Sequence, residues 1–218
     1  MIAPLTPLPI RGVIWYQGES NAGAARSCVY ENLFRALISD WRQRWADEAL
    51  PFLYVQLANF QNSDNWPAVR GAQRKTLAMR STGMAITIDI GEANNIHPSN
   101  KQNVGHRLAL LARTIAYGED MEDSGPLFRY AAPTDGEMVV SFIHADGLTA
   151  AGGNLSGFEL AAEDGMYNPA AATIVGDTVH ARCAAIPHPR YVRYAWSNNP
   201  SASLFNRARL PASPFSSE

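Results

Sequence analysis

Over the first 124 residues, short apolar runs alternate with segments whose apolar positions recur every three or four residues. The run at 12–16 is β-branched and aromatic and predicts a buried strand, whereas the apolar stripe within 31–45 predicts one face of a helix. The same reasoning predicts strands at 12–16, 51–57 and 84–90 and helices at 31–45, 67–79 and 100–118. Alternating strands and helices favour a parallel sheet with right-handed crossovers, so we expect an α/β fold here.

After residue 125 the pattern changes to short runs separated by glycine and proline, without helical periodicity. We expect strands at 138–144, 157–162, 172–175, 178–183 and 191–197. Gly176 and Asp177 lie between two of these runs and predict a hairpin turn. The sequence therefore predicts an α/β domain at 1–124 and a small all-β, sandwich-like domain at 125–218, with a poorly ordered tail over the last eight residues.

Charge and composition narrow the class of partner. The 18 basic and 20 acidic residues give a net charge of −2, so the concentrated basic field that nucleic-acid binding needs is absent. No run approaches the roughly 20 apolar residues that cross a bilayer. The first ten residues hold three prolines and no basic residue, which is not typical of a signal peptide. We expect no nucleic-acid partner and no membrane insertion.

The five histidines and two cysteines show no spacing typical of metal ligands. We therefore expect neither a metal nor a cofactor, and the sequence does not indicate an oligomeric state.

Polar residues follow the first predicted strand in the run Gln17-Gly18-Glu19-Ser20-Asn21. Ligands of open α/β sheets bind at the carboxyl ends of the strands, where this run lies. Gly18 has no Cβ to block approach to its N–H, and Asn21 carries a side-chain amide donor. Two neutral donors that converge suit a developing oxyanion. The alternative is an ordinary turn in which Asn21 caps the next helix.

Ser20 raises a further alternative, a nucleophile elbow of the form G-x-S-x-G. Gly18 supplies the first glycine of that pattern, but Ala22 stands in place of the second. The match is therefore incomplete.

A second polar run, 91–98, follows the third predicted strand and contains His97. Histidine is the usual general base at neutral pH, although a lone histidine is more often structural. Asp89 and Glu92 are near in sequence and are candidates to orient the imidazole.

The two runs together resemble one family. Gly18 to Asn21 resembles the GxxN signature of the SGNH (GDSL-like) hydrolase clan, and the wider run 12–22 resembles its sialate O-acetylesterase branch. The run 95–101 is similar to the histidine block of that branch. Runs at 155–160, 192–196 and 210–215 resemble the carboxyl-terminal part of these esterases.

The resemblance implies a partial SGNH-type parallel three-layer sheet followed by a small β unit. It implies that Gly18 and Asn21 form an oxyanion hole and that His97 is the general base. Gln17 and Glu19 would brace the turn, with Arg70 and Gln73 doing so from the next crossover. The implied reaction is hydrolysis of an acetyl ester on a carbohydrate by a serine esterase, and the implied compartment of the full-length protein is an exported one.

The chain departs from the clan pattern in two ways. Asn94, not an acid, stands three residues before His97. We expect either that Glu92 or Asp89 acts as the acidic partner or that His97 works as a dyad with the serine, and we favour Glu92. The clan's nucleophilic serine belongs to a block upstream of the GxxN block, so we expect it outside this chain, with Val13–Trp15 left at an open edge.

We therefore expect a carbohydrate O-acetylesterase that is inactive as this chain alone. The alternative is a non-catalytic carbohydrate-binding or structural fragment, in which exposed rings of Tyr191, Tyr194 and Trp196 stack on sugars.

Overall fold

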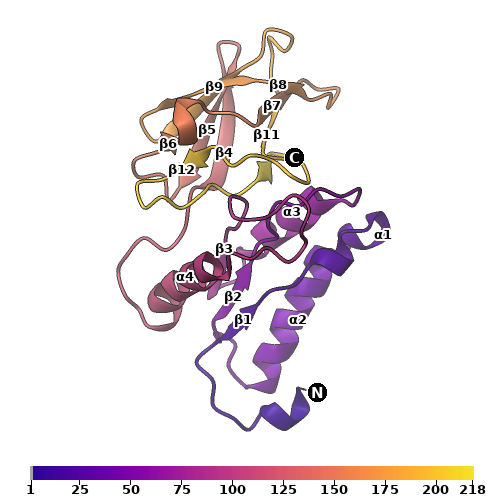
Figure 1. The fold of residues 1–218 in the computed structure, drawn as a ribbon, viewed down its shortest axis with the longest axis vertical. Coiled ribbons are helices and arrows are strands. Elements are labelled where there is room, and N and C mark those ends of the chain that lie inside the picture. Colours follow the sequence, from indigo (N-terminus) through magenta and orange to yellow (C-terminus); the bar gives the residue numbers. More distant parts are fainter. Residues whose placement is uncertain (1) are drawn as a thin grey trace.

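The computed structural model describes residues 2–218, and its first half is built on a parallel sheet (Figure 1). The strands β1 (Val13–Trp15), β2 (Phe52–Val55) and β3 (Thr82–Ala85) lie in the order β1-β2-β3. Val13 pairs with Phe52, which in turn pairs with Thr82. The predicted parallel α/β fold is confirmed. β2 and β3 both end earlier than expected, at Val55 and Ala85, and β3 begins earlier, at Thr82.

Helices cover both faces of this sheet (Figure 1). The helices are α1 (Ala24–Ser27), α2 (Tyr30–Arg44), α3 (Trp66–Thr76) and α4 (Lys101–Leu111), with short helical turns at Ala3–Leu5, Glu19–Asn21 and Ala112–Ala116. Tyr54 of β2 packs on Phe34 of α2, with ring centroids 4.9 Å apart. Its neighbour Leu53 faces the opposite way and packs against Leu111 of α4. Side chains of a strand point alternately to its two faces, so the sheet is the middle of three layers.

β1 forms one edge of the sheet that the structure describes. Its Ile14 pairs with Leu53 in register but is 70% exposed. No helix of residues 2–218 combines the length and the apolar character that crossing a membrane requires.

The second half is a sandwich of antiparallel sheets, as predicted. One sheet has the order β4 (Leu127–Thr134), β5 (Glu137–Ile143), β10 (Thr178–Arg182), β9 (Ala171–Val175), and the other β13 (Phe215–Ser216), β11 (Tyr191–Tyr194), β7 (Phe158–Ala161), β8 (Asn168–Pro169). Two short strands, β6 (Thr149–Ala150) and β12 (Leu204–Phe205), pair beside them, and a turn of 3₁₀-helix spans Ala151–Gly153. Val140, Leu160, Val179 and Phe215 belong to one buried cluster between the sheets.

The expectation of a poorly ordered tail is wrong. Phe215 is fully buried and stacks on Phe128, with ring centroids 4.4 Å apart. It also pairs with Tyr194 of β11. The tail carries an aromatic side chain that completes the core of the sandwich, and burying such a side chain stabilises a fold by roughly 1.5–3 kcal/mol.

Candidate active site

Gly18 occupies a backbone conformation that favours glycine. Its φ is +156° and its ψ is −22°, and it opens a single 3₁₀ turn over Glu19–Asn21. A Cβ at this position would lie 3.1 Å from Val69 Cγ1 and 3.2 Å from Leu57 Cδ1. Both conformation and space therefore select glycine. Among residues 2–218, no backbone or side-chain acceptor takes up the Gly18 N–H.

The amide of Asn21 has a fixed orientation. Gln17 Nε2 donates to Asn21 Oδ1 at 2.7 Å, so the oxygen is occupied and the Nδ2 group remains as a donor. Gln17 is itself held by its carbonyl, which accepts from the Tyr30 hydroxyl at 3.0 Å and from Gln73 Nε2 at 3.3 Å. The arrangement leaves two neutral N–H donors on one turn, which is what an oxyanion site requires.

Gln73 ties this turn to the end of β2. The side chain is fully buried, its Oε1 accepts from Leu57 N at 3.0 Å, and its Nε2 also donates to the Val55 carbonyl at 3.2 Å. The Glu19 carboxylate has no hydrogen bond or ion pair with the part of the chain that the structure describes, but its charge acts on Tyr16. Burial, and then the Glu19 carboxylate, raise the pKa of Tyr16 to about 12.

Among residues 2–218, the Arg70 guanidinium has no hydrogen bond to the turn that we expected it to brace. It is fully buried and donates to four backbone carbonyls, those of Leu57, Ala58, Ser197 and Asn198, at 2.7–2.8 Å. Two of these acceptors lie after β2 and two lie in the β sandwich. Arg70 therefore joins the two halves of the molecule.

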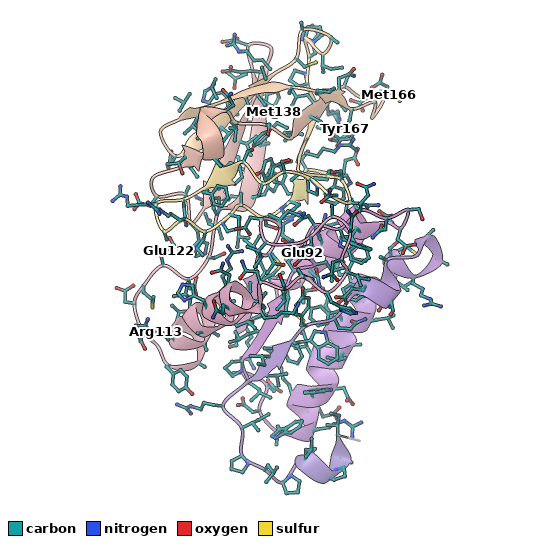
Figure 2. The ribbon with its side chains drawn as sticks, viewed as in Figure 1. Glu92, Arg113, Glu122, Met138, Met166 and Tyr167 are labelled. Carbon is teal, nitrogen blue, oxygen red and sulfur yellow. The ribbon has the colours of Figure 1, made fainter. Side chains whose placement is uncertain are left out.

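His97 lies on an exposed loop after β3. The Glu92 carboxylate joins the two ends of this loop through hydrogen bonds. Glu92 Oε1 accepts from both the N–H and the hydroxyl of Ser99, each at 2.6 Å. Asn95 bridges the other side, because its Nδ2 donates to Glu92 Oε2 at 3.2 Å and its Oδ1 accepts from His97 N at 3.0 Å. The hydrogen bonds from Ser99, and then that from Asn95, lower the pKa of Glu92. Figure 2 shows Glu92 near the boundary between the two halves.

Neither candidate acid bonds to the imidazole in this structure. Glu92 is occupied by the loop, and Asp89 forms a two-pronged ion pair with Arg107 at 2.6 and 2.7 Å. No carboxylate among residues 2–218 hydrogen-bonds to the His97 ring. Sequence reasoning missed Asn95 and Ser99, because ordinary loop composition does not reveal which polar groups the loop turns inward.

The two polar runs meet at the same edge of the sheet. Lys101, at the start of α4, donates to the Pro98 carbonyl at 2.7 Å, and its Nζ lies 5.3 Å from the centroid of the Tyr16 ring. The turn after β1 and the loop after β3 are therefore neighbours. A cavity of about 520 Å³ lies at this edge, between Asn59, Asp89 and Ala93 on one side and Asn199 and Ser201 on the other.

Ser20 does not form a nucleophile elbow with His97 in this structure. It is exposed on the 3₁₀ turn, and the contact it makes is through its carbonyl, which accepts from Arg26 at 3.0 Å.

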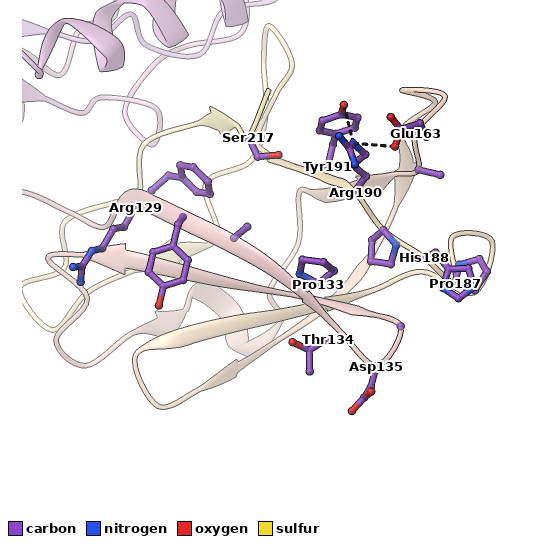
Figure 3. A pocket seen from close by; sticks show the side chains of 16 residues that line it. Arg129, Pro133, Thr134, Asp135, Glu163, Pro187, His188, Arg190, Tyr191 and Ser217 are labelled. Carbon is purple, nitrogen blue, oxygen red and sulfur yellow. Dashed lines mark hydrogen bonds and ion pairs between the residues drawn. The ribbon is translucent and has the colours of Figure 1, made fainter.

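The three aromatic rings considered for sugar stacking differ in exposure. Tyr194 is fully buried, with its hydroxyl accepting from Ser203 N and Leu204 N, so its expected exposure is wrong. Trp196 is half-buried over Gly71, where an added Cβ would lie 2.8 Å from the indole. Tyr191 is half-buried and lines a cavity of about 1000 Å³ beside the Arg190–Glu163 ion pair (Figure 3). That cavity contains none of the predicted catalytic residues.

One group of possible metal ligands gathers among the described residues. Ligand atoms of Glu122, Asp123 and His144 lie within 4.8 Å of one another. Partners within the protein already engage these groups, since His144 Nδ1 lies 2.6 Å from Glu122 Oε1 and Thr114 donates to Asp123.

A parallel sheet that carries paired N–H donors and a histidine at its carboxyl edge is typical of α/β hydrolytic enzymes. Comparison with known proteins narrows this class. The family described as "Carbohydrate esterase, sialic acid-specific acetylesterase" matches residues 3–114, about half of the chain. The chain belongs to this family.

Named relatives agree with that assignment. The sialate O-acetylesterases of Mus musculus and Homo sapiens are 39% and 36% identical over 149 residues, which cover 58% of this chain and 27% and 28% of theirs. The crystal structure of a carbohydrate acetylesterase from Xanthomonas citri superposes with a TM-score of 0.96 at 46% identity, covering all of this chain and 52% of that one. The chain thus spans about a quarter of these curated relatives and about half of the solved structure.

Proposed function

We propose that this chain carries the oxyanion hole and the general base of a carbohydrate O-acetylesterase. The observation that carries the proposal is the Gln17–Asn21 hydrogen bond, which occupies Asn21 Oδ1 and leaves the Asn21 Nδ2 group as a donor on the same turn as the Gly18 N–H. Family membership supports the reaction class, and the loop after β3 supplies His97 at the same edge of the sheet.

In the proposed reaction His97 takes the proton of a serine hydroxyl as the serine oxygen attacks the acetyl carbonyl. The carbonyl oxygen becomes an oxyanion, which accepts hydrogen bonds from Gly18 N and Asn21 Nδ2. His97 then returns the proton to the departing sugar oxygen, leaving an acetyl-serine. Water hydrolyses that ester in a second step with the same donors, and acetate leaves.

The supporting residues act through the two loops. Gln17 orients Asn21, Gln73 holds Gln17, and Glu19 keeps negative charge beside the turn. Glu92 is linked to the backbone N–H of His97 through Asn95, so we propose that it positions the His97 loop rather than acting as the direct partner of the imidazole. Arg70 positions the segment that follows β2.

We propose that the nucleophilic serine lies outside these 218 residues, within the part of the relatives that this chain does not span. Among residues 2–218, Ser20 has no hydrogen bond to His97, which supports this proposal. We also propose that residues up to 124 and residues 125–218 are two domains, because the sandwich has a buried cluster drawn from 125–218 alone and the other large cluster takes all its buried residues but Leu127 from the first half.

A chimera tests the activity. In it, this chain replaces the matching 52% of the Xanthomonas citri acetylesterase. We expect the chimera to hydrolyse 4-nitrophenyl acetate and O-acetylated sialic acid, and the isolated chain to show little turnover. Asn21→Ala in the chimera should lower kcat by roughly 100-fold or more, since one oxyanion donor is removed. Robust turnover by the isolated chain that Ser20→Ala abolishes would contradict the proposed location of the nucleophile.

A further inference from the structure

The His97 loop begins at Gly91, where its backbone lies directly against the segment that follows β2. Gly91 N donates to Asn59 Oδ1 at 2.8 Å. A Cβ on Gly91 would lie 2.3 Å from the Asn59 carbonyl oxygen, so the loop is pressed directly onto Asn59. Two residues further on, the Ala93 carbonyl accepts from Gln61 N at 2.9 Å. The segment after β2 therefore holds the start of the His97 loop.

Asn59 is in turn held from the β sandwich. Its Nδ2 donates to Asn199 Oδ1 at 2.8 Å. The direction of this bond follows from its neighbour: because the Gly91 N–H needs an oxygen, the amide of Asn59 must present its NH₂ group to Asn199. Asn199 thus gives the Asn59 side chain a second anchor in the orientation that accepts from Gly91.

The loop that carries Asn199 has fixed anchors of its own. The buried guanidinium of Arg70 donates to the carbonyls of Ser197 and Asn198 at 2.7 and 2.8 Å, and Phe60 N donates to the same Asn198 carbonyl at 3.1 Å. Asn199 therefore projects from a stiff base, and the cavity of about 520 Å³ described above lies beside it.

We propose that Asn199 is a positioning residue for His97, so that the β sandwich holds the general-base loop of the esterase site through the chain Asn199–Asn59–Gly91. This proposal rests on the proposed function for the role of His97, but the contacts that carry it are independent of catalysis. It assigns the β sandwich a part in the catalytic machinery that is different from binding a sugar.

The test uses two substitutions of Asn199 in the 218-residue chain and in the chimera. Asn199→Ala removes the acceptor for Asn59, whereas Asn199→Asp keeps a carboxylate oxygen in its place. Asn198→Ala is the matched control, because the neighbouring side chain also crosses between the halves but bonds to Asn62 and Trp66 instead. Thermal melting by circular dichroism verifies that each variant is folded.

The first readout is amide hydrogen exchange at Gly91, followed by NMR in the 218-residue chain. We expect exchange to become about tenfold faster in Asn199→Ala, to return to within about threefold in Asn199→Asp, and to stay within about twofold in Asn198→Ala. The second readout is kcat and KM of the chimera on 4-nitrophenyl acetate, where Asn199→Ala should lower kcat roughly tenfold with KM nearly unchanged.

Unchanged Gly91 exchange in Asn199→Ala, or equal acceleration in Asn198→Ala, would overturn the positioning role. Failure of the proposed function gives a different result. In that case His97→Ala would leave the turnover of the chimera intact, while Gly91 exchange would still respond to Asn199.

Discussion

At the scale of single residues, the surroundings of Gly18 fix its backbone conformation, and those of Asn21 fix the orientation of its amide. Gly18 has a φ that other residues rarely adopt and less than 3.5 Å of space toward Val69 and Leu57. Asn21 has its oxygen occupied by Gln17, which leaves its NH₂ group as a donor. Both constraints come from contacts within the protein itself, so the donors of the proposed oxyanion hole are preorganised.

Gly18→Ala tests this constraint. The new methyl group would strain the backbone and crowd Val69 and Leu57, so we expect a loss of stability of roughly 1–3 kcal/mol and a fall in the kcat of the chimera. Thermal melting and turnover measure the two effects. Gly23→Ala is the control, because Gly23 has an ordinary φ of −58° and open space around its Cβ position. Equal effects of the two substitutions would contradict the steric account.

At the scale of elements, the sequence predicts where the strands lie better than how the loops after them are held. Periodicity predicts the three strands of the sheet, and the runs around Gly18 and His97 follow two of them. The hydrogen bonds from Asn95 and Ser99 to Glu92 could not be predicted, since they depend on the conformation of an irregular loop. The tail was mistaken for a disordered end because its single aromatic residue, Phe215, has its partners far away in the sequence.

The loop around His97 should respond to acid through Glu92. Hydrogen bonds from Ser99 and Asn95 lower the pKa of Glu92 in the folded protein. The stabilisation is therefore present above the unfolded pKa of about 4.3 and is lost as the pH falls through the lower folded value. We expect the protection factor of the Ser99 amide, from hydrogen exchange, to be constant above about pH 5 and to drop below about pH 4.

Glu92→Gln should lower Ser99 protection at neutral pH and remove its dependence on acid. Glu119→Gln is the control, because Glu119 also has a lowered pKa, but its cause is Arg113 in the helical turn Ala112–Ala116 that follows α4. A Glu92→Gln variant with the acid dependence of the parent would show that another group controls the loop.

At the scale of the whole molecule, one buried cation joins the two halves. Burial lowers the pKa of Arg70 to about 9, which still leaves it charged at neutral pH. Its four carbonyl acceptors come from both sides of the junction, so removing the guanidinium leaves buried acceptors on each side.

Arg70→Met should therefore destabilise the protein by on the order of 3–5 kcal/mol and lower Tm by roughly 10 °C. Arg80→Met should change Tm by less than about 2 °C, because the Arg80–Glu48 ion pair is largely exposed. Differential scanning calorimetry measures both. A similar Tm for the two variants would show that the hydrogen bonds of Arg70 do not stabilise the contact between the two halves.

The central claim is that His97 is the general base, and its direct test is the kcat of the chimera after His97→Ala, with His106→Ala as the control on the exposed face of α4. The account predicts that His97→Ala lowers kcat on 4-nitrophenyl acetate by at least about 100-fold and that His106→Ala leaves it within about twofold. Near-normal turnover in His97→Ala would contradict the account.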